Sequence, residues 1–517
     1  MEHKRQLSNT AQTGINMVAS FMTYGVSLLV SFFLSPYIVK NIGVDANGFI
    51  TLANNFIGYV ALVTIALNTL SGRFVTVKLY QHQETEANQY YSSVFFANAF
   101  LSAIISLIGV VVVLFLDKFL DISKSILPDI RLLFAILFVN FCIGTIGNVF
   151  SVATFATNKL YLSSIVGIIT NIVRAGVLVF LFSIFAPKTY YVAVAGLVTT
   201  VLTVGSNVVF TKKLTPQLKL SIRSFDIKKV RELFSGGIWA TVNRLGQIFM
   251  NDLDLLITNM FINSIEMGVL SLSKTIPNAI IGVVGTVVGV FSPNYTILYA
   301  QGKHDELVKN IKQTMKIMGV IVNIPVIILI VCGKQFYSLW QPTVDSDKLY
   351  MLSILAISGI IVSGGINCIY NIFTVVNKLR ANAIVVVVTG FLSLLIAFLL
   401  LKNTSLGIYA VAGTSTAISI LRNLLFTAPY GAKCLNLKWY AFFPEIIRPV
   451  IYVTISSAVA SFFVRYINVH TWIILIITVA FVVLLSFLIG YFIVLNKEER
   501  RIIVDIVNTK ILKKVLS

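Results

Sequence analysis

Apolar stretches of about 20 residues recur along nearly the whole chain, separated by short polar intervals. A helix of that length crosses a hydrocarbon core about 30 Å thick, and about fourteen such stretches can be distinguished. Charged residues make up only 12% of the chain and hydrophobic residues 57%, whereas soluble domains are roughly 25% charged. The sequence therefore excludes a soluble core and predicts an all-α polytopic membrane protein with about 14 transmembrane helices.

Basic residues indicate how these helices cross the membrane. If the N-terminus is cytoplasmic, the cytoplasmic intervals hold about three times as many Lys and Arg as the outer ones, as the positive-inside rule requires. The N-terminal sequence MEHKRQLSNTAQTG leads into the first apolar stretch without a cleavage site, so we expect this stretch to remain as a helix. We predict a multi-pass protein of the bacterial cytoplasmic membrane with both termini in the cytoplasm.

The net charge of +20 is spread over short loops beside apolar helices. Anionic lipid headgroups are the partner expected for such loops, and nucleic acid is not. The final segment mixes charges with apolar residues as an interfacial amphipathic helix does. Its apolar residues are Ile502, Ile503, Ile506, Ile511 and Val515.

Nothing in the sequence favours a catalytic or metal centre. The four cysteines lack metal-site spacing, and the four histidines fall in predicted tails or loops. No grouping of a nucleophile, a base and an orienting residue is visible. We therefore expect neither an enzyme nor a cofactor or metal.

A weak internal repeat appears when the chain is displaced by 220 residues. IGVDANGFITLANNFIGYV, from Ile42, then aligns with INSIEMGVLSLSKTIPNAI, from Ile262. Gly48 falls on Gly268, and Asn55 falls on Thr275. Two repeated lobes with a site between them are typical of transporters. The predicted divisions are an N-terminal six-helix lobe (1–213), a basic cytoplasmic loop (214–234), a C-terminal six-helix lobe (235–430), two peripheral helices (431–495) and a cytoplasmic amphipathic tail (496–517).

Polar residues within the apolar stretches cluster on single helical faces. Such groups avoid lipid, so their faces indicate where the protein interior lies. At about 100° per residue, the first span (14–39) has one continuous polar face. Its members are Asn16, Ser20, Thr23, Ser27 and Ser31. The second span repeats this pattern with Thr51, Asn54, Asn55 and Gly58, and the eighth with Ser271, Lys274, Thr275 and Asn278.

The seventh span, 235–261, carries the most polar face. Within a sector of about 100° lie Asn243, Arg244, Gln247, Asn251, Asp254 and Thr258. Asp252 lies about 160° from Asp254 on an ideal helix. We therefore expect Asp254 to share a face with Arg244, where it either neutralises the Arg or carries a coupling ion, and we expect Asp252 to matter less.

Four basic residues fall inside the spans: Arg174, Arg244, Lys274 and Arg422. Only two acidic residues, Asp252 and Asp254, accompany them there. A buried charge without compensation is too costly to keep unless a watery cavity or an anionic ligand accompanies it. Pyrophosphate suits Arg, whose planar group binds it in bidentate fashion. The predicted substrate-binding residues are these four cations with Asn54, Asn55, Asn251 and Asn278. The alternative is that the polar groups serve helix packing alone.

The sequence also resembles the polysaccharide transporter family, the Wzx-type flippases of the multidrug/oligosaccharidyl-lipid/polysaccharide exporter superfamily. The resemblance rests on SPYIVKNIGVDANGFITLANN, on its weaker echo DLDLLITNMFINSIEMGVLSLSKTIPNAI, and on the layout of the spans. It implies two six-helix bundles and alternating access for an oligosaccharide linked to undecaprenyl pyrophosphate, used for capsule or another surface polysaccharide. The implied partners are this lipid-linked substrate and polysaccharide polymerase or assembly proteins.

Several alternatives stay open at this point. A cation-coupled multidrug exporter of the same superfamily is disfavoured by the extra spans and by the excess of Arg and Lys. A peptidoglycan-precursor flippase needs the same phosphate chemistry. A membrane polymerase or ligase would want a long outer loop, which the chain lacks. The sequence does not distinguish coupling to H⁺ from coupling to Na⁺, and it does not indicate the sugar.

Overall fold

The computed structural model describes residues 9–494 and residue 500. Throughout this part of the chain every regular element is a helix, which confirms the predicted all-α membrane class. Apart from Arg500, the predicted amphipathic tail (496–517) lies outside the described residues.

Twelve helical segments among the described residues are long and apolar enough to cross a membrane. A thirteenth results if the bent pair Ser264–Ser273 and Thr275–Val288, which meet at 40°, counts as one span. The predicted seventh span forms consecutive helices over Ile227–Phe261, but its Arg, Asn and Asp residues make it too polar to be counted with the others. The number of spans is thus close to the predicted fourteen.

The helices form two compact units. Unit 1 is Met1–Ser271 with Ala383–Leu395, and unit 2 is Leu272–Asn382 with Ile396–Ser517. Unit 1 therefore includes Ile227–Phe261, the polar segment that follows the first six spans. The predicted six-helix lobes and their boundaries stay a prediction, because the units record how helices pack and not how the sequence repeats.

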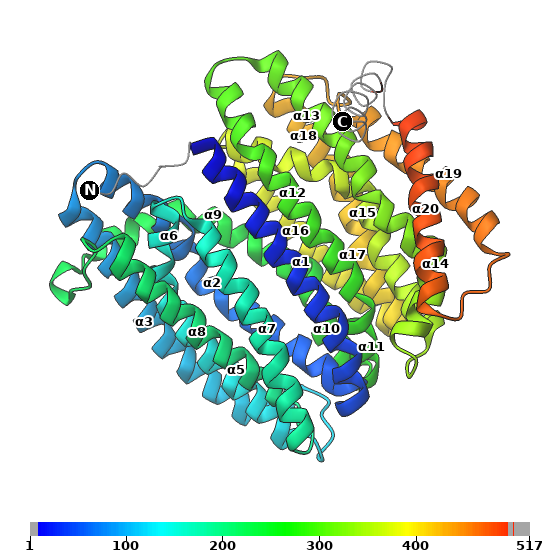
Figure 1. Cartoon of the computed structure of the whole chain (residues 1–517), viewed down its shortest axis with the longest axis horizontal. Helices are drawn as coiled ribbons and strands as arrows, with labels where there is room; N and C mark the ends of the chain where they lie inside the picture. The colour runs from blue at the N-terminus through cyan, green and yellow to red at the C-terminus, as the bar shows by residue number, and fades with distance from the viewer. Residues whose placement is uncertain (1–8, 495–499, 501–517) are drawn as a thin grey trace, which may run out of the picture. The chain divides into compact units, whose positions relative to one another are not determined.

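The first six spans of unit 1 are long helices joined by short connections. They are α1 (Asn9–Ile42), α2 (Val44–Tyr80), α3 (Glu84–Leu114), α5 (Leu127–Gly147) with its continuation through the 3-10 turn η1 (Asn148–Ser151) and α6 (Val152–Ala156), α7 (Leu160–Ile184) and α8 (Tyr191–Leu214). Figure 1 shows α7, α8, α5 and α3 running side by side. Helix α1 packs on α7, α3 on α5, and α5 on α8.

The rest of unit 1 follows a loop with the short turn η2 (Ile222–Ser224). It contains α9 (Ile227–Gln247), the π-helical turn η3 (Ile248–Asp252), α10 (Asp254–Phe261) and most of α11 (Ser264–Ser273). Helix α2 packs closely on α9. A Cβ atom at Gly237 would lie only 2.1 Å from the carbonyl oxygen of Ala66, so the two backbones touch in the way that small residues permit in membrane bundles.

Unit 2 is built around one central helix, α15 (Ser346–Val375), which packs against six other α-helices. The surrounding elements are α12 (Thr275–Ala300), α13 (His304–Ile321), α14 (Asn323–Trp340), α17 (Ile408–Arg422) with η4 (Asn423–Thr427) and α18 (Ala428–Cys434), and α19 (Phe443–Val464). Helix α20 (Trp472–Ile493) packs on α14 and α19. Helix α16 (Leu379–Asn403) contributes to both units.

Candidate functional site

The polar segment of unit 1 contains an ion pair between Arg244 and Asp252. Arg244 Nη2 lies 2.7 Å from Asp252 Oδ2, and the two side chains are 37% and 20% exposed. Asp252, and not Asp254, is therefore the acid that neutralises Arg244. This corrects the prediction made from an ideal helical wheel.

The π-helical turn η3 explains why the wheel was wrong. The N–H group of Leu253 donates to the carbonyl of Ile248, five residues earlier, over 3.1 Å. Such a turn holds one residue more than an α-turn, so every following side chain is rotated back by about 100°. Asp252, the last residue of this turn, thereby comes onto the side of Arg244.

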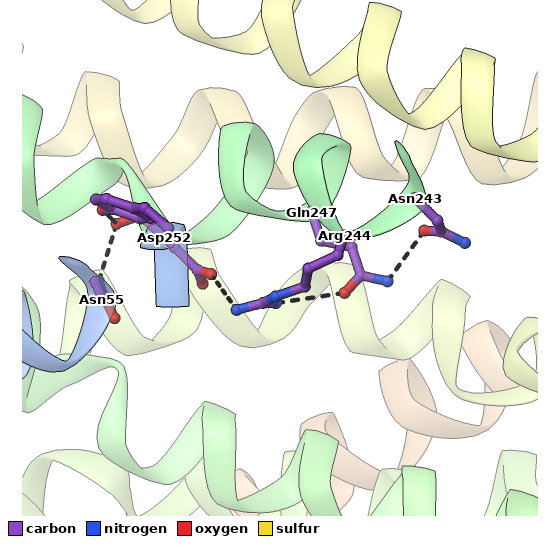
Figure 2. A network of polar contacts seen from close by, with 6 residues as sticks. Asn55, Asn243, Arg244, Gln247 and Asp252 are labelled. Atoms are coloured by element: carbon purple, nitrogen blue, oxygen red, sulfur yellow. Dashed lines mark hydrogen bonds and ion pairs between the residues drawn. The ribbon is translucent and has the colours of Figure 1, made fainter. Parts of the chain in front are cut away.

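The ion pair belongs to a longer row of polar contacts, which Figure 2 shows. Arg244 Nη1 donates to Gln247 Oε1 over 3.5 Å, and Gln247 Nε2 donates to Asn243 Oδ1 over 3.2 Å. The row follows the predicted polar face of the seventh span as far as η3. Because the pair and the amides are partly exposed, this face can meet water or a ligand.

Two side chains of α2 bind the backbone at η3. Asn55 Nδ2 and Tyr59 Oη donate to the carbonyl oxygen of Asp252, over 2.9 and 2.7 Å. This oxygen lies where the regular helix is interrupted, so a side-chain donor satisfies it there. Asn55, a predicted substrate-binding residue, is thus engaged in holding α2 against the polar segment.

Asp254, the ion-coupling candidate, lies at the start of α10 and is 4% exposed. Thr258 Oγ1 donates to its backbone carbonyl over 2.8 Å. Its coupling role stays a prediction. Asn251, inside η3, has an exposed side chain.

The two copies of the internal repeat meet within unit 1. Thr51 Oγ1 and Ser271 Oγ lie 2.7 Å apart. A Cβ atom at Gly48 would lie 2.8 Å from the Cα atom of Gly268. Both pairs join residues that the displacement of 220 equates, so α2 and α11 cross at equivalent positions.

Part of the polar face of α1 forms hydrogen bonds within unit 1. Asn16 is 5% exposed, and its Nδ2 donates to Asn158 Oδ1 over 2.9 Å, while its Oδ1 accepts from the N–H of Tyr161. Thr23 Oγ1 donates to the carbonyl of Ser164 over 2.9 Å. These bonds attach α1 to α7 and to the turn before it, so Asn16 and Thr23 serve helix packing.

A cavity of about 210 Å³ lies among α2, α5, α7 and α8. Two of the predicted substrate-binding residues, Arg174 and Asn54, line it. Sequence reasoning missed Asn140, Thr199 and Thr200, which also line it. The available signal was a polar amide inside the apolar fourth span, because such groups are rare in membrane helices and face the protein interior.

A larger cavity of about 560 Å³ adjoins this one, since both are lined by Asn54, Leu137, Asn140 and Thr200. None of its lining residues carries a formal charge, and many are amides or hydroxyls. Asn68, on its wall, exchanges amide hydrogen bonds of 3.2 and 3.0 Å with the fully buried Asn98.

The remaining candidates lie in unit 2. Arg422 Nη2 donates to the hydroxyl of Tyr370 over 3.1 Å, and this hydroxyl donates to Asn423 Oδ1 over 2.9 Å. Lys274 directly precedes α12, at the bend after α11, and Asn278 has an exposed side chain. Binding roles for these residues stay a prediction.

The profile of a family described as "Polysaccharide biosynthesis protein" matches residues 49–339, more than half of the chain. The chain belongs to this family. It is 27% identical over 489 residues to a Bacillus subtilis (strain 168) protein described as "Uncharacterized membrane protein EpsK", covering 95% of this chain and 97% of that protein. Membership of the family confirms the resemblance inferred from the sequence.

Solved structures with the same fold are transporters of the MOP superfamily. The lipid II flippase MurJ, in an inward closed conformation, matches 92% of this chain and 98% of its own with a TM-score of 0.64 and 13% identity. An inward-facing multidrug resistance MATE transporter matches 82% of this chain and 98% of its own, with a TM-score of 0.62 and 12% identity. At these identities the likeness shows the fold, which this chain shares with membrane transporters and flippases.

Proposed function

We propose that this member of the family is a flippase. It moves oligosaccharide repeat units, carried on undecaprenyl pyrophosphate, across the bacterial cytoplasmic membrane by alternating access, for capsule or another surface polysaccharide. The family's description as polysaccharide biosynthesis proteins and the fold shared with a lipid II flippase support this proposal.

One observation carries the proposal furthest: Arg174 lies in the middle of a membrane helix without an acidic partner. In the described part of the chain its side chain makes no hydrogen bond or ion pair, yet it lines a polar cavity. A guanidinium kept in a membrane without an acid favours an anionic ligand. The pyrophosphate of a lipid-linked sugar is such a ligand, and the drugs of cation-coupled exporters do not supply one in general.

The proposal includes further elements. Asp254 carries the coupling H⁺ or Na⁺, both termini are cytoplasmic, and anionic lipids surround the basic loops. Polysaccharide polymerase or assembly proteins receive the translocated unit. No cofactor is required, because transport alone changes no covalent bond.

The test is reconstitution of the purified protein in liposomes containing a fluorescent lipid-linked oligosaccharide. We expect the label to become accessible to an impermeant quencher far faster than in protein-free liposomes. Arg174→Gln should slow this rate about tenfold or more, because hydrogen bonds to charged groups contribute about 1.5–3 kcal/mol. Protein that leaves the lipid on one leaflet, but confers drug resistance on cells, would be an exporter and not a flippase.

A further inference from the structure

Arg174 lies too deep in unit 1 to reach the membrane surface. Ten residues separate it from the end of α7 at Ile184, which is about 15 Å along the helix. A long basic side chain escapes lipid by extending to the interface only near a helix end. The charge must therefore be solvated inside the helix bundle.

The cavity around Arg174 offers a second group suited to a ligand. Asn140 Oδ1 is buried and has no hydrogen-bond partner among the described residues. A buried carbonyl left in this state costs about 1–3 kcal/mol, and a hydroxyl group in the cavity would satisfy it. Asn54 Nδ2 donates to the carbonyl oxygen of Ile50 over 2.8 Å, which leaves Asn54 Oδ1 able to accept a hydrogen bond from a ligand.

The adjoining chamber has the chemistry of a sugar site. Its volume of about 560 Å³ falls in the range of about 300–1,000 Å³ that is usual for ligand pockets. Amides and hydroxyls both donate and accept hydrogen bonds, as sugar hydroxyls require. Asn148 is exposed on this wall, and its side chain makes no hydrogen bond to any described residue.

We propose that unit 1 holds a two-part binding site lined by its own helices. Arg174 binds an oxyanion, Asn140 Oδ1 accepts a hydrogen bond from a hydroxyl group of the same ligand, and the adjoining chamber with Asn148 binds further sugar hydroxyl groups. The ligand class is a sugar that carries a negative group beside its ring. This inference rests on the proposed function and assigns a place to part of its substrate.

The oxyanion has two chemical sources in such a substrate. It is either the phosphate that joins the first sugar to the lipid or a carboxylate on an acidic sugar of the repeat unit. Both would make charge-assisted, bidentate contacts with a guanidinium, so the geometry serves either. Soluble probes can separate them.

The experiment measures binding by calorimetry to the full-length protein in phosphatidylcholine nanodiscs. The probes are N-acetylglucosamine 1-phosphate, glucuronate, inorganic pyrophosphate and uncharged N-acetylglucosamine. We expect one of the two charged sugars to bind at least tenfold more tightly than N-acetylglucosamine. Tighter binding of the sugar phosphate would assign the site to the phosphate, and tighter binding of glucuronate would assign it to a carboxylate.

Variants then locate the site. Arg174→Gln should weaken binding of the charged sugar about tenfold or more. Asn140→Asp should weaken this binding by a similar factor at nearly constant side-chain volume, because the new carboxylate neutralises Arg174. Asn148→Ala should weaken binding of the charged sugar about threefold and leave binding of pyrophosphate unchanged. Arg223→Gln removes an equal charge from an exposed position in the loop and should have no effect.

Melting temperatures of each variant show whether it remains folded. If folded Arg174→Gln and Asn140→Asp proteins bind every probe as the wild type does, the two-part site is wrong even where liposomes still show flipping. If the probes bind as expected while no lipid-linked oligosaccharide is translocated, the site stands and the proposed function fails. Binding of no charged sugar by the wild type overturns the inference.

Discussion

The hydroxyl oxygens of Thr51 and Ser271 lie 2.7 Å apart, although the residues are separated by 220 positions in the chain. That separation is the displacement at which the sequence repeats. A residue in contact with its own equivalent is what a two-fold relation between two copies produces. The crossing of α2 and α11 is therefore a place where a change should have large effects.

Gly48 and Gly268 make this crossing possible, because a Cβ atom at Gly268 would lie 2.3 Å from the carbonyl oxygen of Val44. We expect Gly268→Ala to destabilise the protein by about 1–3 kcal/mol, since overpacking forces backbones apart. Thermal unfolding in detergent measures the change. Gly205→Ala is the matched control, because a Cβ atom there meets nothing within 4 Å, and an equal loss in both variants would contradict the prediction.

Arg244 and Asp252 should behave as a coupled pair. Asp252→Asn and Arg244→Gln should each lower stability, while the double variant should recover part of the loss, because it leaves neither charge alone. For a partly exposed pair the coupling energy should be about 1 kcal/mol. A double-mutant cycle of unfolding measures it, and strictly additive losses would show that the pair contributes nothing. Asp254→Asn, combined with Arg244→Gln in a parallel cycle, should show no such coupling.

Asp254 is proposed to carry the coupling ion, so Asp254→Asn should remove the response of flux to an imposed gradient. The expected result is a low flux that no longer rises when a pH or Na⁺ gradient is applied to liposomes. Asp252→Asn should lower flux at most modestly and keep the response. A full gradient response in Asp254→Asn protein would exclude the coupling role.

The contact between Arg422 and Tyr370 should position the guanidinium in unit 2. Tyr370→Phe removes an acceptor from Arg422 and a donor to Asn423, so we expect a several-fold slower flux at equal membrane abundance. Tyr409→Phe is the control, because the Tyr409 hydroxyl makes no hydrogen bond to any described residue. Equal rates in the two variants would leave Arg422 with a packing role only.

The sequence by itself determined the membrane class and the approximate position of most helices. Each span depends on the apolarity of about 20 consecutive residues, which is a local property. The repeat was also readable, since Gly48 and Gly268 align in the sequence before they touch in the structure. The cations Arg174, Arg244 and Arg422 could be recognised because charges in apolar segments are rare.

Only the tertiary structure decided which groups meet. The π-helical turn at Ile248–Asp252 places Asp252 where it forms an ion pair with Arg244. A single inserted residue of this kind leaves no mark in a helical-wheel pattern. Asn16 and Thr23, on the polar face of α1, attach this helix to α7 and to the turn before it. Arg174 and Asn140 share a cavity because α5 and α7 both face it. Periodicity shows which side of a helix is polar. Which residues that side contacts depends on helix register and packing, and these arise between segments far apart in the chain.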